Sequence, residues 1–213
     1  MSIRRSSHDV TLLDALSELP EVPFTGDLWR VVNGARSPID GSKGAGRWNL
    51  RESEVLYCAL EKDGALSEIH FHISRQQSVF PSRLTSTAYR LRAQLGRTLD
   101  LTDKNLLVRL GVDLGRYTEI LYDRTQKIGE AVNFLGFEGM LVPNARHEST
   151  NLVVFPQNCD LDELQEIEGT EICQRRSKTR PKGGAKVGHF GVGREGRIER
   201  WRPVDRAPQI AGG

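Results

Sequence analysis

Apolar residues recur at helical spacing in three stretches of the chain. Residues 9–19 repeat leucine every three or four positions before Pro20, and residues 103–112 and 125–134 carry similar stripes. Apolar side chains at positions i, i+3 and i+4 share one face of a helix. We therefore predict three amphipathic helices, with Gly111 at the end of the second one.

Short apolar runs predict strands in four other places, at 27–33, 54–59, 140–142 and 151–155. Residues 65–73 fit either a helix or a strand, and we favour a helix that begins near Gly64. Residues 79–101 mix strand and loop signals. Because strands and helices do not alternate strictly, the pattern favours an α+β fold over a doubly wound parallel sheet.

Composition narrows the class of protein. The chain has 213 residues, of which 38% are hydrophobic and 27% charged, so it can bury a core without metal or disulfide support. No apolar run approaches the ~18 residues of a membrane helix, and the first twenty residues lack the pattern of a signal peptide. Cys58, Cys159 and Cys173 form no CxxC pair and no zinc spacing. We expect a cytoplasmic protein that does not contact a membrane.

The net charge of +2 hides an asymmetry between the two parts of the chain. Residues 174–213 hold eleven basic and three acidic residues, whereas residues 1–173 hold 19 basic and 25 acidic ones. The C-terminal segment is also rich in glycine. It is either a solvated tail or a surface that binds nucleic acid or an acidic partner.

A glycine-rich segment at residues 34–49 is the first candidate for a binding loop. It contains neither GxxxxGK[ST] nor GxGxxG, which argues against a P-loop and a dinucleotide-binding turn. It ends in Gly46-Arg47-Trp48-Asn49. Glycines allow a close approach of backbone to ligand, and an adjacent arginine can grip a phosphate. The alternative is an ordinary surface loop.

Three further side chains stand out because polar groups interrupt apolar runs. Arg30 either extends its charge to solvent or points into a polar cleft. Tyr57 is either a core aromatic or part of a site. Glu68 is either catalytic or half of a salt bridge, because a carboxylate in apolar surroundings costs free energy unless it is paired. His70 and His72 lack a third ligand, so we expect no metal site.

Taken in order, these motifs resemble the RES-domain family of bacterial toxins over residues 27–156. The matching segments are Leu28-Trp-Arg-Val-Val32, Gly46-Arg-Trp-Asn49, Val55-Leu-Tyr-Cys-Ala59, Ala65-Leu-Ser-Glu68, Gly136-Phe-Glu-Gly-Met-Leu-Val-Pro143 and Asn151-Leu-Val-Val-Phe155. The chain departs from the family at Asn144, where the family has serine. Ser149, five residues later, is the other residue that could take the place of the family's serine.

The resemblance implies an ADP-ribosyltransferase-like fold, with mixed sheets and flanking helices around an NAD cleft. It implies a toxin that cleaves NAD+ at the nicotinamide–ribose bond as a glycohydrolase or phosphorylase, or one that transfers ADP-ribose to a protein. Its partner would be a helix-turn-helix (Xre-type) antitoxin, with nucleic acid reached only through that partner. NAD+ is the substrate and no metal is needed. The rival interpretation is a non-enzymatic protein that binds nucleic acid through the basic tail.

The resemblance also assigns parts of the chain and site residues. It divides the chain into an N-terminal helical segment (1–26), a RES-like catalytic domain (27–173) and the basic tail (174–213). The catalytic residues would be Glu68, Arg30 and Tyr57. The residues expected to bind NAD+ are Arg30, Arg47, Trp48, Asn49, Tyr57, Asn144, Ser149 and Asn151.

The chemistry of these residue types agrees with that assignment. Breaking the nicotinamide–ribose bond passes through a state resembling an oxocarbenium ion. Nicotinamide leaves as a neutral molecule, so no general acid is required. The Glu68 carboxylate would stabilise the positive charge that develops on the ribose, Tyr57 would stack on nicotinamide, and Arg30 and Arg47 would bind the diphosphate from opposite sides of one cleft.

Overall fold

The protein is described by a computed structural model that covers residues 9–34, 36–42, 44–75 and 85–172. The expectations for the basic tail and for Cys173 lie outside these residues. The elements are, in chain order, α1 (Val10–Ser17), β1 (Glu21–Asn33), β2 (Leu56–Ala59), α2 (Lys62–Arg75), β3 (Ser86–Asp100), α3 (Lys104–Arg109), η2 (Leu114–Arg116), α4 (Asp123–Phe134), β4 (Gly139–Pro143), β5 (Thr150–Val154), η3 (Leu161–Glu163) and β6 (Leu164–Ile172).

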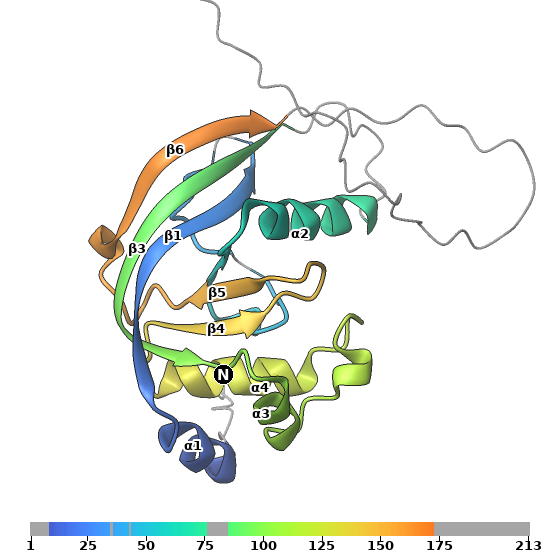
Figure 1. Ribbon diagram of the computed structural model, residues 1–213. Helices are drawn as coiled ribbons and strands as arrows, with labels where there is room; N and C mark the ends of the chain where they lie inside the picture. The colour runs from blue at the N-terminus through green and yellow to red at the C-terminus, as the bar shows by residue number, and fades with distance from the viewer. Residues whose placement is uncertain (1–8, 35, 43, 76–84, 173–213) are drawn as a thin grey trace, which may run out of the picture.

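The strands form one sheet that curves back on itself. Their order is β1-β2-β5-β4-β3-β6, and β1 also pairs with β3, so five strands close a ring while β6 lies outside it on β3. The pairing of β3 with β4 is parallel, and all the others are antiparallel. Figure 1 shows the long strands β1, β3 and β6 as a curved wall beside the short pair of β4 and β5.

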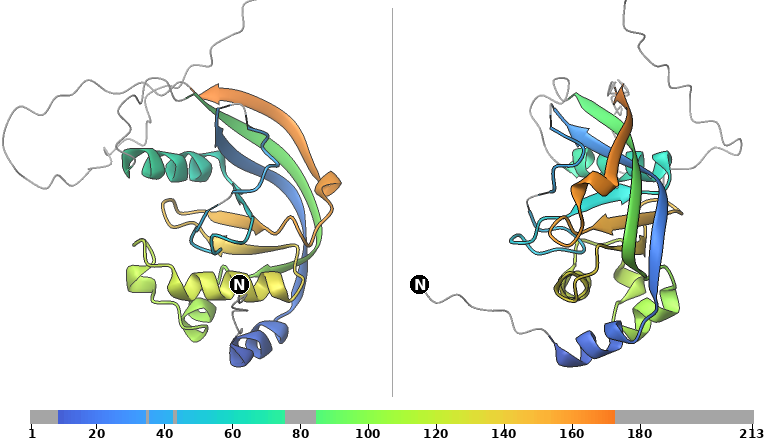
Figure 2. Two further views of the ribbon diagram at one scale, coloured as in Figure 1. Left: turned by 180° about the vertical axis from the view of Figure 1, so that it is seen from behind. Right: turned by 90° about the vertical axis from the view of Figure 1, so that its left-hand side faces the viewer.

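Helices cover the two sides of the β4–β5 pair. α2 lies on one side and α3 and α4 lie on the other, as Figures 1 and 2 both show. Leu12 and Leu16 of α1, Ile128 of α4 and Met140 of β4 belong to the larger hydrophobic core. A second core, which includes Leu28, is formed by residues of β1, β2, β3, β5 and β6. Helices and a mixed sheet around shared cores confirm the α+β class.

Most predicted elements are present close to their expected positions. The three amphipathic helices are α1, α3 and α4, and the ambiguous segment 65–73 is helical, as favoured, within α2. Gly111 has a φ of 85° and follows the end of α3, which is the backbone conformation expected of a helix-terminating glycine. No helix in the described part of the chain is long and apolar enough to cross a bilayer.

Two strands differ from expectation. β1 begins at Glu21 rather than at residue 27, because residues 21–26 pair with β3 around a register shift at Pro23. Residues 21–26 therefore belong to the same strand as residues 27–33. β6 was not predicted, because its sequence LQEIEGTEI buries only its first and last residues and has no alternating apolar face.

Candidate active site

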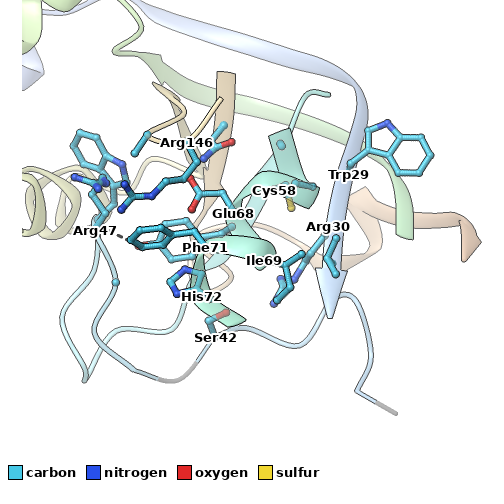
Figure 3. A pocket seen from close by; sticks show the side chains of 18 of the residues that line it. Trp29, Arg30, Ser42, Arg47, Cys58, Glu68, Ile69, Phe71, His72 and Arg146 are labelled. Atoms are coloured by element: carbon cyan, nitrogen blue, oxygen red, sulfur yellow. Dashed lines mark hydrogen bonds between the residues drawn. The ribbon is translucent and has the colours of Figure 1, made fainter. Parts of the chain in front are cut away.

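A cavity of about 320 Å³ opens between β1, β2, α2 and the loop that precedes β2. This volume is at the lower end of the range for small-molecule sites. Arg30, Arg47, Trp48, Tyr57, Glu68 and Asn151 line it, and Figure 3 shows Glu68 between the two arginines. Six of the nine residues assigned from the sequence thus share one cavity, although they come from segments up to 121 positions apart.

Arg30 reaches the cavity because it occupies a position on the buried face of β1, where its neighbours Leu28 and Val32 are apolar. Residues 28, 30 and 32 alternate with more exposed neighbours, so their side chains point to the same side. The Arg30 side chain donates from Nη2 to the Asp40 carbonyl at 2.6 Å, and its Nη1 is buried without a hydrogen-bond partner in the described part. Burial lowers the pKa of this guanidinium. Arg30 therefore points into a cleft and does not extend its charge to solvent.

Glu68 lies half-buried on α2 and faces the cavity. Within residues 9–34, 36–42, 44–75 and 85–172 it has no ion pair within 4.0 Å and no hydrogen bond, so the salt-bridge alternative is not observed. Its charge acts electrostatically on Tyr57, Tyr117 and Arg146. The Glu68 carboxylate therefore faces the cavity and is not used in an ion pair or hydrogen bond with the described residues.

Tyr57 uses its hydroxyl to hold the preceding loop. The oxygen accepts a hydrogen bond from the Trp48 N–H at 2.9 Å and donates one to Asn49 Oδ1 at 2.8 Å. Asn49 is fully buried, and its Nδ2 donates to the carbonyls of Gly44, Leu50 and Ser53. Burial raises the pKa of Tyr57, so the hydroxyl remains neutral. Asn49 is not on the cavity wall, and its observed contacts shape the loop that carries Arg47.

Helix α4 holds the same loop from the other side. Gln126 Nε2 donates to the Gly46 carbonyl at 2.8 Å, and the Glu130 carboxylate accepts from Leu50 N–H and the Ser53 hydroxyl. Gly129 lets the two backbones approach: a Cβ there would lie 1.8 Å from the Trp48 carbonyl oxygen. The loop is therefore fixed by α4 before any ligand arrives.

We expect Gly129→Ala to destabilise the protein by at least about 3 kcal/mol, because the added methyl group would collide with backbone. Higher helix propensity would return only about 1 kcal/mol. The free energy of unfolding in urea measures the difference. Gly96→Ala is the control, because its Cβ would meet only the Glu138 carboxylate at 3.9 Å and should change stability by less than about 0.5 kcal/mol. Equal stability of the two variants would contradict the close packing.

Arg47 is held by two aromatic rings at the end of the cavity opposite Arg30. Its guanidinium carbon is 4.7 Å from the Tyr117 ring centroid and 4.6 Å from that of Tyr122, and Nη2 donates to the Glu119 carbonyl at 3.2 Å. Such cation–π contacts fix the plane of the guanidinium while leaving the charge available. Figure 3 shows Arg47 and Arg30 on either side of Glu68 and Phe71.

The loop between β4 and β5 carries the residues expected to replace the family serine. Asn144 Nδ2 donates to Asn151 Oδ1 at 2.9 Å, and Asn144 Oδ1 accepts from the N–H groups of Arg146 and His147. Ser149 Oγ is buried without a partner in the described part. Neither Asn144 nor Ser149 lines the cavity, whereas Asn151 does. The observed work of Asn144 is to shape the turn, and the binding roles of both residues stay predictions.

Sequence reasoning missed several lining residues, among them one arginine and two aromatic residues. Arg146 follows Asn144 in the β4–β5 loop, Phe71 lies one helical turn after Glu68, and Tyr122 precedes α4. The signal for Phe71 was present, because positions i and i+3 of a helix share a face. The signal for Arg146 was a cation three residues after Pro143, the last residue of the Gly136–Pro143 motif.

The requirements of metal-binding and thiol sites can also be compared with the described part of the chain. The described residues contain no group of three potential metal ligands. Cys58 and Cys159 are both free, and burial raises the pKa of the Cys58 thiol to about 11. That thiol stays protonated at neutral pH and is a poor nucleophile.

Comparison with known proteins identifies the family. No curated protein is significantly similar to this chain in sequence. The fold is similar to that of a chain in the crystal structure of the M. tuberculosis MbcT–MbcA toxin–antitoxin complex, with a TM-score of 0.69, 20% identity, and coverage of 77% of this chain and 93% of that one. The model of the RES domain matches residues 27–174, which include every motif noted above. The chain belongs to the RES domain family.

Proposed function

We propose that this protein cleaves NAD+ at the bond between nicotinamide and ribose. The observation that carries the proposal is the Glu68 carboxylate, which has no ion-pair partner among the described residues and shares one cavity with Arg30 and Arg47. A cavity whose described lining has several cations and one carboxylate suits an anionic ligand that develops positive charge at one carbon. Membership of the RES domain family supports the same choice.

The proposed reaction needs little from the protein beyond electrostatics. The C1′–N bond breaks and its electron pair moves to the pyridinium nitrogen, so nicotinamide leaves neutral. The ribose C1′ becomes cationic, and the Glu68 carboxylate stabilises that charge. Attack by water then gives ADP-ribose and one proton. If phosphate attacks C1′ in place of water after the same first step, the protein is a phosphorylase. If a protein side chain attacks, the protein is an ADP-ribosyltransferase.

Arg30, Arg47 and Tyr57 would bind the other parts of NAD+. The two phosphates of NAD+ are anionic, and the acidic body of the chain does not attract them by its overall charge. Arg30 and Arg47 supply local donors. The Tyr57 ring, fixed through its hydroxyl by Trp48 and Asn49, offers a surface for nicotinamide. An ADP-ribosyltransferase-like arrangement around an NAD cleft is part of this proposal.

Release of nicotinamide from NAD+ by the purified full chain is the direct test. Chromatography of the products separates the acceptors, because water yields ADP-ribose, phosphate yields ADP-ribose 1″-phosphate, and a protein acceptor gains mass. Absence of nicotinamide with every acceptor supplied would overturn the proposal.

Arg47→Lys should weaken NAD+ binding about tenfold while the protein stays folded. Lysine keeps the charge but loses the planar fork and its stacking between Tyr117 and Tyr122. The apparent KM for NAD+ and a thermal melt measure the two effects. Arg116→Lys is the matched control, because Arg116 pairs with exposed Glu119 and lies outside the cavity. An unchanged KM for Arg47→Lys would remove Arg47 from the binding residues.

We further propose that the protein acts as the toxin of a toxin–antitoxin pair, with a helix-turn-helix antitoxin as partner. The support is the family and the similarity in fold to a chain from such a complex. Induced expression in bacteria should stop growth and lower cellular NAD+, and Glu68→Gln should do neither. Normal growth and NAD+ levels during wild-type expression would count against this role.

A further inference from the structure

We propose that Arg146, which the sequence did not single out, binds a phosphate of the substrate on the Glu68 side of the cavity. The identity of the substrate rests on the proposed function, but the inference concerns the anion site itself. The site would recognise the phosphate attached to a ribose whose hydroxyl groups face Glu68. Arg146 lines the cavity with Glu68 and Arg47, and Figure 3 shows it directed toward both.

The position of Arg146 is fixed on three sides. Its backbone N–H donates to Asn144 Oδ1 at 2.7 Å, and its side-chain Nη1 donates to the Thr118 carbonyl at 2.5 Å. The guanidinium carbon lies 3.3 Å from the centroid of the Phe71 ring. These contacts hold the planar group in one orientation, so little side-chain entropy is lost when a ligand binds. Pre-organised donors of this kind are typical of anion-binding sites.

The protein does not saturate the donors of this guanidinium. An arginine has five N–H donors. Among the described residues, its side-chain hydrogen-bond partners are the Thr118 carbonyl and Tyr122. Its Nε is buried without a partner in the described part of the chain. Burial lowers the pKa of the group, which means that the fold holds this charge at a cost in free energy. A bound anion would offset that cost.

The Glu68 carboxylate of the same cavity does not neutralise Arg146. Its charge acts on Arg146 electrostatically, yet no ion pair within 4.0 Å joins the two among the described residues. Arg47 adds a second positive charge that acts on Arg146. This end of the cavity therefore carries two cations and one anion, with space between them. The net charge favours an anionic group there.

The spacing along α2 explains why a ribose phosphate fits. Phe71 lies three residues after Glu68, so the ring that supports Arg146 and the carboxylate share one helix face. A ribose 5′-phosphate carries its hydroxyl groups and its phosphate on the same small unit. One such unit can present hydroxyl groups to Glu68 and phosphate oxygens to Arg146 at the same time.

A purely structural role makes a different prediction. If Arg146 only tied the β4–β5 loop to residue 118, its loss would lower stability and weaken every ligand equally. Arg97 provides a matched control, because its Nη1 also donates to a backbone carbonyl, at Leu135, and its guanidinium also lies over a phenylalanine, Phe137, at 4.4 Å. Arg97 is not among the cavity residues.

Calorimetric titration of the full chain with ADP-ribose, and NMR titration with nicotinamide riboside, which has no phosphate, test the inference. We expect Arg146→Ala to weaken ADP-ribose binding by at least tenfold and nicotinamide riboside binding by less than about threefold. Arg97→Ala should leave both unchanged. Arg146→Lys retains the charge, and it should recover part of the ADP-ribose affinity; it also serves if the alanine variant does not fold.

Each result decides the matter. Equal losses for the two ligands, an unchanged affinity for ADP-ribose, or no binding of ADP-ribose by the wild-type chain would each overturn the role of Arg146. Binding of ADP-ribose that depends on Arg146, in a protein that releases no nicotinamide from NAD+, would support the anion site and reject the proposed reaction. The two failures are thus distinguishable.

Discussion

Glu68→Gln should lower the turnover of NAD+ by about 100- to 1,000-fold, which is the usual loss when one charge-stabilising group is removed. Glutamine retains the shape of the side chain and one of its two acceptor oxygens, but not its negative charge. The charge matters mainly when C1′ becomes cationic, so kcat should fall far more than substrate binding. Initial rates of nicotinamide release, measured over a range of NAD+ concentrations, separate the two effects.

The structure offers a close control for this substitution. Glu61 lies just before α2, is exposed, and does not line the cavity. Glu61→Gln removes the same charge from the protein and should leave kcat unchanged. The melting temperature of Glu68→Gln should also be unchanged, since Glu68 forms no ion pair or hydrogen bond with the described residues that would be lost with its charge. Wild-type turnover by a folded Glu68→Gln protein would exclude Glu68 as the catalytic carboxylate.

The sequence predicted elements whose apolar residues repeat with a clear period. Leu12 and Leu16 of α1 are both buried, and the stripe that predicted α4 includes Ile128 and Val132, which are fully buried. β6 could not be predicted in this way, because it is an edge strand held by backbone pairing with β3 rather than by an apolar face. The early part of β1 was hidden for a related reason, since Pro23 interrupts its pattern.

Site residues could be predicted where a polar group was out of place. Arg30 and Glu68 each interrupt an apolar run, and both line the cavity. The aromatic support of Arg47 could not be predicted, because Tyr117 and Tyr122 lie about 70 positions away and meet Arg47 only after folding. The buried hydrogen bonds of Asn49 could not be predicted either. From the sequence alone, a motif residue that shapes a loop cannot be distinguished from one that contacts a ligand.

The second large effect is expected at Arg30. Arg30→Ala should reduce NAD+ cleavage by at least about 100-fold, because the guanidinium is a buried cation of the cavity wall and its Nη1 has no partner in the described part of the protein. A phosphate or ribose oxygen would satisfy that donor. A buried donor that loses its charged partner typically costs several kcal/mol, so the ligand should depend strongly on it.

The alternative is that Arg30 stabilises the fold, and the contacts argue against it. The described residues place no carboxylate within 4.0 Å of Arg30, and its hydrogen bond goes to the carbonyl of exposed Asp40, which water can satisfy instead. Removing a buried charge that lacks an ionic partner relieves desolvation, which offsets the packing lost with the side chain. The melting temperature of Arg30→Ala should therefore stay within a few degrees of the wild-type value.

A neighbouring arginine separates the effects of the site from those of the sheet. Arg90 lies on β3 opposite Trp29 and pairs with Asp27 and Glu168, outside the cavity. Arg90→Ala should cost at most about 1 kcal/mol of stability and leave NAD+ cleavage intact. Loss of activity in Arg30→Ala at an unchanged melting temperature, with an active Arg90→Ala protein, assigns Arg30 to the ligand. Unfolding of Arg30→Ala would instead assign its buried charge to the stability of β1.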